Sequence, residues 1–290
     1  MNTATAHPLA LRRNALRAGC SRGWIETRQS FTETANLVGH LVPAAAYIAV
    51  LFMLRGKTAP GTDFALNTMV LPSLLSMSIV FGGLSGPATG LVADREDGTL
   101  LRAKATPHGM LGYLIGKIVM FALTTLVGFV VIVCFGAVIE DDLVFNARAL
   151  LLLAVLFVAG MVATVPLGVA LGAVMKSTAQ SMLVPLACAL LIFPSGIFYP
   201  ISALPSWLQW IGQAFPIYWV GLGARSAMLP NEMVAAEIAG SWRTLEMFAV
   251  LGAWAAIGLV LAPTLLRRMA RHQSGSALAQ VRERYLSKGY

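Results

Sequence analysis

Long stretches without a charged residue constrain this chain more than any other feature. Residues 37–54 and 64–92 contain no Asp, Glu, Lys or Arg. Each is close to the roughly 20 residues that a helix needs to cross about 30 Å of hydrocarbon. Further apolar runs follow at about 107–139, 149–174, 181–199 and 244–266. We therefore predict an all-α polytopic membrane protein with six transmembrane helices.

The composition agrees with a membrane protein and argues against a soluble enzyme. Hydrophobic residues make up 57% of the chain and charged residues only 12%, whereas about a quarter of an ordinary globular domain is charged. The formal net charge of +8 would suggest nucleic acid in a soluble protein. In a membrane protein, basic segments instead set the topology and contact anionic lipid. We expect membrane lipids as partners and no nucleic acid.

The distribution of Lys and Arg predicts the orientation. Sixteen of them lie in the N-terminal arm, the loop after the second span, the cytoplasmic ends of later spans and the tail, against five on the other side. The positive-inside rule then places both termini in the cytoplasm, here of a bacterial inner membrane, which requires an even number of spans. Residues 1–36 form a cytoplasmic arm, 37–266 the six-helix domain and 267–290 a basic tail.

The arm has an amphipathic pattern at helical period. Trp24, Arg28, Phe31 and Ala35 fall on one side of a helical wheel, and charged or amide side chains fall on the other. This pattern is typical of a helix that lies along a membrane surface, with Arg28 reaching the headgroups. Whether the helix only rests on lipid or also contacts a cytoplasmic partner stays open.

A second irregular segment lies between the fifth and sixth runs. Residues 200–216 contain three prolines together with Trp207 and Trp210 and are too interrupted to span a membrane. Segments of this kind settle at the interface or re-enter where protein shields the backbone. We predict re-entrant or interfacial external helices here.

The most charged internal loop carries the strongest motif. Residues 94–106 predict a short helix that starts at Asp97 or Thr99, with acidic residues at its N-terminal end, where the helix dipole favours them. Thr106 and Pro107 predict the start of the third span. The loop is either a solvated connection or a rigid helix that transmits force from a docked protein.

The segment ADREDGTLLRAKATP…LIGK, which ends at Lys117, resembles the E-x-G-T-x-x-R-x-x-x-T-P…G-K signature of the permease subunits of ABC-2-type transporters. The matching positions are Glu96, Gly98, Thr99, Arg102, Thr106, Pro107, Gly116 and Lys117. Residues 195–229 are similar to a second region of that family, through Gly196, Pro200, Pro205, Trp207, Pro216 and Arg225. Among its members, the daunorubicin and antibiotic-resistance exporters look most similar. Ala103 and Ala105 depart from the family, which usually has leucines there.

The resemblance implies a coupling helix at about 94–106 that sits in a groove of a separate ABC ATP-binding subunit, with two ATPase subunits and two permease copies, a homodimer or a close heterodimer. ATP and Mg²⁺ would bind the ATPase, and this chain would hold no cofactor and no catalytic residue. The stretch from Gly112 to Ile118 is one residue short of a phosphate-binding loop and lacks its Ser/Thr. The coupling residues would be Glu96, Gly98, Thr99, Arg102, Thr106, Pro107, Trp24, Arg28 and Phe31.

The predicted function is therefore outward movement of an amphiphilic substrate, such as a drug, lipid or polyketide, driven by a partner ATPase. The first five runs contain no Asp or Glu, so a relay of buried carboxylates is poorly supported. A partner-free secondary carrier or a membrane scaffold is the alternative. Uncharged side chains could line a path, although such residues more often form helix-packing contacts. These residues are Asn67, Ser73, Met77, Phe81, Thr124, Ser195 and Phe198.

The sequence shows no metal site. The four histidines are scattered, and the three cysteines lie far apart. There is no C-x-x-C or H-E-x-x-H spacing that would bring ligands together. We accordingly expect neither a metal ion nor a disulfide in this chain.

Overall fold

The computed structural model describes residues 8–33, 45–49, 52–53, 66–106, 109–139, 143–197, 201–230, 233–234 and 237–287. In these ranges all regular structure is helical, without a strand. Four of the described helices are apolar and long enough to cross a membrane: Met69–Glu96, Gly109–Ile139, Ala147–Val174 and Thr244–Met269. The prediction of an all-α, multi-pass membrane protein is confirmed. The expected first span, 37–54, lies largely outside the described residues, so the count of six stays a prediction.

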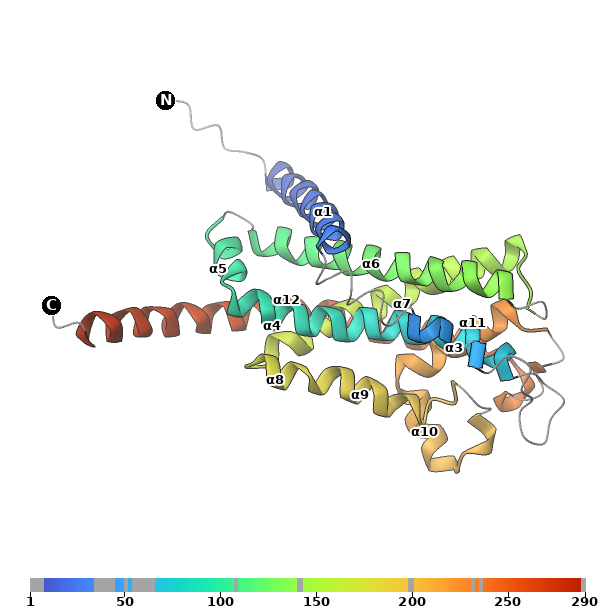
Figure 1. Ribbon diagram of the computed structural model, residues 1–290. Coiled ribbons are helices and arrows are strands. Elements are labelled where there is room, and N and C mark those ends of the chain that lie inside the picture. Colours follow the sequence, from blue (N-terminus) through green and yellow to red (C-terminus); the bar gives the residue numbers. More distant parts are fainter. Residues whose placement is uncertain are drawn as a thin grey trace.

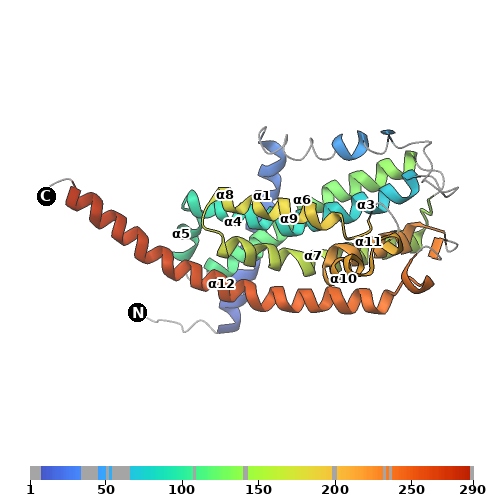
Figure 2. The same ribbon diagram turned by 90° about the horizontal axis from the view of Figure 1, so that it is seen from below.

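The four long spans run side by side (Figures 1 and 2). The first consists of α3 (Leu66–Val80), the π-helix η1 (Phe81–Ser85) and α4 (Gly86–Glu96), and the others are α6 (Gly109–Ile139), α7 (Ala147–Val174) and the first part of α12 (Thr244–Ser287). Helix α7 packs against α4, α11 and α12 and forms the centre of the bundle. Helices α6 and α12 expose leucines and valines, which suits a lipid environment rather than water.

Small residues of α7 bring its backbone into contact with η1 and α4. A Cβ at Gly168 would lie 2.5 Å from the carbonyl oxygen of Leu84, and one at Gly172 would lie 2.6 Å from that of Ala88. Only glycine therefore fits at these positions. Helices in membranes associate through such close approaches, because lipid tails leave little hydrophobic gain from burying larger apolar side chains. Pro72, Gly82 and Gly83 in the sequence predict a kink in this span, and the span contains the π-helix η1, which includes both glycines.

The fifth apolar run is shorter than the prediction of 181–199. It consists of α8 (Thr178–Ser181) and α9 (Leu183–Ile192), and together they reach only about 22 Å at 1.5 Å per residue. Pro194 and Gly196 explain the early end, since proline cannot continue the hydrogen-bond ladder and Gly196 has a φ of 59°. The chain then turns back through η2 (Ile201–Ala203).

Two short helices follow at the same end of the bundle. Helix α10 (Ser206–Ala214) presents Trp207 and Trp210, which are 61% and 76% exposed. Helix α11 (Pro216–Met228) is instead buried over almost its whole length. The polarity of residues 225–243 predicts a loop that starts at Arg225, and this prediction is wrong. Arg225 lies within α11, only 2% exposed, and its Nε atom lies 2.6 Å from Glu237 Oε1 in a buried ion pair.

The last of the four long spans and the tail form one continuous helix. Helix α12 runs from Thr244 to Ser287 and projects beyond the other spans toward the C-terminus (Figures 1 and 2). Near Glu237, the 3-10 turn η4 (Ile238–Gly240) precedes it. The end of the bundle that carries α5 (Thr99–Lys104) and α8 is called the charged end below.

Candidate functional site

Helix α1 (Pro8–Thr32) crosses α6 at a steep angle near the charged end (Figures 1 and 2). Its buried face is made of small residues: Gly19, Gly23, Thr27 and Ser30. A Cβ at Gly23 would lie 2.6 Å from the carbonyl oxygen of Gly116. The two backbones therefore touch, in the manner of small-residue helix contacts.

The face that the helical wheel singled out is not the packing face of α1. Trp24 is 62% exposed and Arg28 is also exposed, while Phe31 is half-buried. The helical wheel identifies a face by the hydrophobicity of its side chains. Helix α1 instead packs on α6 through glycines and through residues with hydroxyl groups. Trp24 and Arg28 are thus accessible to lipid or to a partner.

Lys117 joins three helices at the charged end. Its Nζ atom lies 3.0 Å from Glu26 Oε2 of α1 and 2.8 Å from Asp94 Oδ2 of α4. Lys117 is 8% exposed, so water screens these contacts little. One lysine of α6 therefore balances two carboxylates that belong to separate segments, and the lysine network defined by Lys117, Glu26 and Asp94 ties α1 to two spans.

Two more side chains complete the lysine network. Tyr113 donates its hydroxyl to Asp94 Oδ2 at 2.6 Å, and Arg22 Nε donates to Glu26 Oε1 at 2.6 Å. The Arg22 guanidinium also lies 5.3 Å from the centroid of the Tyr113 ring, within the range of a cation–π contact. Each carboxylate therefore has two partners, which offsets part of the cost of burying charge.

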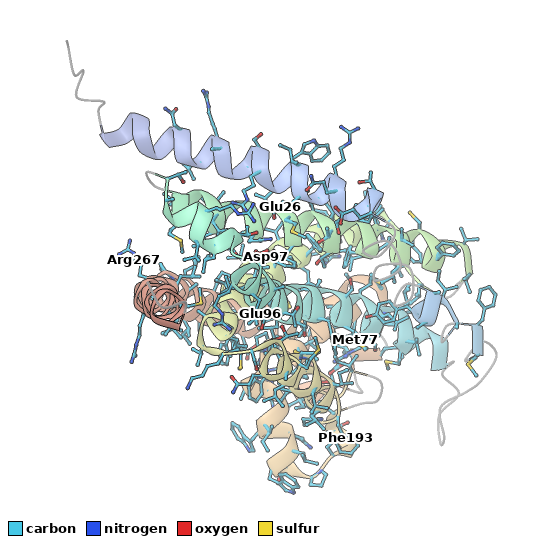
Figure 3. The ribbon with its side chains drawn as sticks, turned by 60° about the vertical axis from the view of Figure 1, so that its left-hand side comes forward. Glu26, Met77, Glu96, Asp97, Phe193 and Arg267 are labelled. Atoms are coloured by element: carbon cyan, nitrogen blue, oxygen red, sulfur yellow. The ribbon has the colours of Figure 1, made fainter. Side chains whose placement is uncertain are left out.

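The pKa of Glu26 reflects this environment. Burial raises the pKa of the carboxyl group, but the positive charges of Lys117 and Arg22 lower it by more, so that the pKa lies below its ordinary value of 4.5. Glu26, labelled in Figure 3, is therefore an anion at neutral pH. Its charge holds α1 on the bundle.

The turn after α4 forms the predicted short helix. Asp97 Oδ1 accepts the N–H of Thr99 at 2.8 Å, and Gly98 has a φ of 79°, a left-handed conformation that favours glycine. Helix α5 therefore begins at Thr99, one of the two predicted starts. The hydroxyl of Thr106 donates to the carbonyl of Ala103, so Thr106 closes α5, whereas Pro107 lies outside the described residues.

Two side chains in the last turn of α4 form hydrogen bonds with a second loop, the one that joins α7 to α8. Glu96 accepts the N–H of Thr178 at 3.0 Å and its hydroxyl at 2.6 Å. Thr178 is the first residue of α8, where a carboxylate is favoured by the exposed N–H groups and the helix dipole. Arg95 Nη1 donates to the carbonyl of Met175 at the end of α7. Glu96 and Asp97 lie beside each other at this end (Figure 3).

Helix α5 has one buried and one exposed face. Leu100 and Ala103 pack in a cluster with Leu91, Leu266 and Met269 of the adjoining spans. Leu101, Arg102, Ala105 and Thr106 are exposed. The chain closes tightly behind α5, because a Cβ at Gly109 would lie 1.9 Å from the carbonyl oxygen of Ala103, so only glycine fits at 109. The loop thus presents a short cationic and apolar surface on a fixed support.

The structure brings five predicted coupling residues, Glu96, Gly98, Thr99, Arg102 and Thr106, into one turn and helix. Sequence reasoning missed the residues that hold this unit in place. Asp94 and Arg95 were noticed only as charges of the loop, and Tyr113 and Thr178 attracted no attention because each is an ordinary polar residue by itself. Glu26 was noticed only as a charge on the polar side of the arm, and Lys117 only as a motif position. A lysine inside an apolar run was the available signal, since such a charge requires a partner.

Three of the predicted path residues hydrogen-bond to the backbone. Ser73, Thr124 and Ser195 are buried, and their hydroxyls donate to main-chain carbonyls of Met69 or Ile197, Met120 and Ile192, respectively. Such bonds are typical of helix packing. Met77 (Figure 3) and Phe81 are half-buried. The side chain of Asn67 and the whole of Phe198 lie outside the described part.

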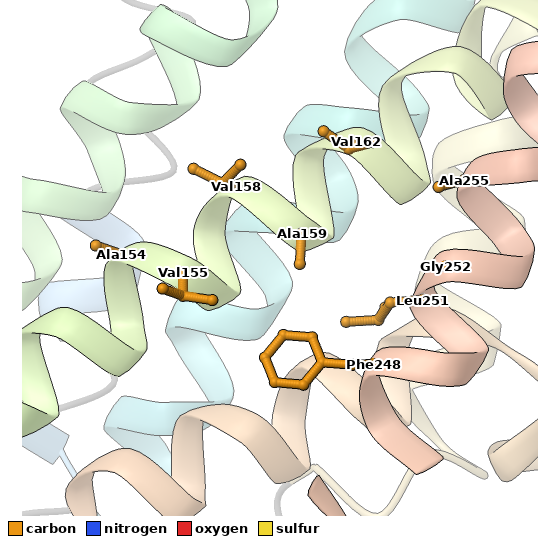
Figure 4. A pocket seen from close by; sticks show the side chains of 9 residues that line it. All are labelled: Ala154, Val155, Val158, Ala159, Val162, Phe248, Leu251, Gly252 and Ala255. Atoms are coloured by element: carbon orange, nitrogen blue, oxygen red, sulfur yellow. The ribbon is translucent and has the colours of Figure 1, made fainter. Parts of the chain in front are cut away.

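A separate groove lies between α7 and α12 (Figure 4). Its volume is about 520 Å³, and its lining is entirely apolar. None of the predicted path residues contributes to it. The lining residues are Ala154, Val155, Val158, Ala159, Val162, Phe248, Leu251, Gly252 and Ala255.

Replacing Gly23 should release α1 from the bundle. A leucine there would overlap Gly116 and Val119, because even a Cβ would lie 2.6–2.7 Å from them. In Gly23→Leu we expect the amides of α1 to exchange with deuterium at least about tenfold faster, as local opening becomes easier. Ala18→Leu, at an exposed position of the same helix, is the control and should exchange as the wild type does. Equal exchange in both variants would contradict the packing described here.

Four apolar helices of spanning length in the described residues, with a clamped, charged loop at one end, define a polytopic membrane protein. Comparison with protein families agrees with this class. Residues 57–260 match the family described as "ABC-2 family transporter protein", and the chain belongs to this family as a membrane permease. Membership in this family implies that the chain has an ATP-binding subunit as its partner. A search of the curated proteins found no significant match.

Proposed function

We propose that the chain is the permease subunit of an ATP-driven exporter that moves an amphiphilic substrate outward. The charged end then faces the cytoplasm of a bacterial cell, and a separate ATP-binding subunit docks on the exposed face of α5. The clamping of α5 carries this proposal. Arg95 and Glu96 bind the loop that joins α7 to α8, and Asp94 binds Lys117 of α6.

A clamped helix can transmit displacement. A push on Leu101 and Arg102 passes into α4 and α6 directly, because α5 lies between these two spans in the chain. The same push reaches α7 through Arg95 and reaches α1 through the lysine network. Two ATPase subunits closing on ATP and Mg²⁺ would thus move several spans together. Trp24, Arg28 and Phe31 of α1 would extend the docking surface.

The complete transporter in this proposal contains two permease copies, with the substrate passing between them. Ser73, Met77, Phe81, Thr124 and Ser195 are candidates for its path only if the spans separate, because three of these side chains already bond to the backbone. The exposed Trp207 and Trp210 would lie at the outer interface of the membrane. Drugs of the daunorubicin kind are the substrate class that the residue pattern suggests.

The test is co-reconstitution with a candidate ABC ATP-binding subunit. We expect the wild-type permease to bind the ATPase and to raise its ATP hydrolysis in liposomes. Arg102→Glu reverses the charge on the exposed face of α5 and should abolish binding. Arg148→Glu, an equally exposed arginine outside the charged end, is the control. If the wild-type chain neither binds nor stimulates the ATPase, a partner-free carrier or scaffold becomes the better interpretation.

A further inference from the structure

A groove between α6 and α12 opens near the charged end of the bundle. Its volume is about 210 Å³. Five of its six lining side chains are apolar and the sixth is a guanidinium. The lining residues are Met110, Leu111, Leu114, Pro263, Leu266 and Arg267. This combination of an apolar floor and a single cation distinguishes it from the wholly apolar groove between α7 and α12.

The cation and the apolar floor lie at different depths. Arg267 is in the last turn of the span Thr244–Met269, whereas Pro263 lies one turn earlier, about 6 Å deeper. Met110 and Leu111 are in the first turn of α6, at the same end of the bundle. The guanidinium is thus at the level of lipid headgroups, and the floor points toward the hydrocarbon.

Arg267 also differs from Arg22 and Lys117, the basic residues of the lysine network. Arg22 and Lys117 bind carboxylates, but within the described ranges no ion pair involves Arg267. Its side chain is exposed and is labelled beside the end-on ribbon of α12 in Figure 3. A cation at this depth therefore remains able to bind an external anion.

We propose that this groove binds one anionic phospholipid of the cytoplasmic leaflet. The phosphate lies against Arg267, and an acyl chain lies along Leu111, Leu114 and Pro263. A soluble anion would not use the apolar floor, and a neutral lipid would not use the cation. Basic pockets between spans are a recurring mode of lipid-headgroup binding. The placement in the cytoplasmic leaflet rests on the orientation given under the proposed function.

The lipid would also stabilise the charged end. Leu266 lines the groove and packs in the cluster that includes Leu100 and Ala103 of α5. An acyl chain that fills the groove would therefore support one side of Leu266 while α5 supports the other. The lipid composition of the membrane would set how often the groove is occupied, and occupancy of the groove would stabilise the position of α5.

The test is native mass spectrometry of the purified full-length chain with phosphatidylglycerol or phosphatidylcholine of identical acyl chains. We expect the wild type to retain phosphatidylglycerol preferentially. Arg267→Gln should weaken that retention about fivefold, the effect of one basic residue at a membrane surface. Arg268→Gln is the matched control, because Arg268 is equally exposed but does not line the groove, and it should retain the lipid as the wild type does.

A second pair of variants tests the floor. Leu111→Trp fills the groove and should abolish retention, while Leu261→Trp, exposed on α12 outside the groove, should not. Equal losses in Arg267→Gln and Arg268→Gln would mean diffuse charge attraction and would overturn the proposal. A dimer that excludes phosphatidylglycerol and is lost in Leu111→Trp would overturn it too, in favour of a second copy. No ATPase is present in this experiment, so its outcome is independent of the coupling test.

Discussion

Glu96→Lys should leave the ATPase bound to the permease but reduce the stimulation of ATP hydrolysis about tenfold, within the usual range of coupling free energies. The wild-type carboxylate accepts two hydrogen bonds from Thr178 at the start of α8. A lysine removes both acceptors and places a positive charge at a helix N-terminus, which repels it. The link from α5 to the second loop is then lost, while the exposed face around Arg102 stays intact.

Three comparisons sharpen this expectation. Glu96→Gln keeps one acceptor oxygen and should give an intermediate stimulation, and Thr178→Val, which removes only the hydroxyl donor, should also be intermediate. Glu246→Lys makes the same charge change at a carboxylate that is 54% exposed outside the charged end and should behave as the wild type does. Full stimulation by Glu96→Lys would show that the bond to Thr178 plays no part in transmission.

Lys117→Met should destabilise the folded protein by about 3 kcal/mol, since it leaves Glu26 and Asp94 buried without their shared cation. We expect an apparent melting temperature roughly 6–10 °C lower, by the size scaling for larger domains. Lys176→Met, which removes an exposed lysine at the same end, is the control and should melt as the wild type does. Thermal unfolding in detergent, followed by fluorescence, measures both.

A triple variant separates charge imbalance from general damage. Glu26→Gln, Asp94→Asn and Lys117→Met together remove the lysine and both of its carboxylates. The melting temperature should return close to the wild-type value, because the one charge left without its carboxylate, Arg22, has a side chain that is 32% exposed and can be solvated. A single Lys117→Met variant that melts as the wild type does would contradict the description of the lysine network. Failure of the triple variant to recover would indicate instead that methionine does not fit among the three helices.

Much of the fold could be predicted because spanning a membrane is a matter of length and apolarity. The runs at 64–92, 107–139, 149–174 and 244–266 all correspond to long helices. The predicted length of the helix at 181–199 was wrong, because hydropathy ignores Pro194 and Gly196, which end the helix early. Helix α11 escaped notice because it is short and contains Arg225, a residue that looks like a loop residue until its buried partner Glu237 is known.

The candidate site could be predicted only in part, for a related reason. The positions of Glu96, Gly98 and Thr99 follow from local signals of helix ends. The lysine network joins residues up to 91 positions apart, from Glu26 to Lys117, and no local pattern encodes such pairing. The docking face of α1 was missed because glycine contributes nothing to a hydrophobic wheel, although it is what lets two backbones meet.

Helix α12 has the geometry of a lever, because it continues without interruption from the last long span to Ser287. Beyond Met269, where the span ends, the helix extends about 27 Å at 1.5 Å per residue. A tilt of about 10° within the membrane would therefore displace its tip by about 5 Å, by the same geometry. A movement of the span too small to alter side-chain packing is in this way enlarged outside the bilayer, where a neighbouring subunit can respond to it.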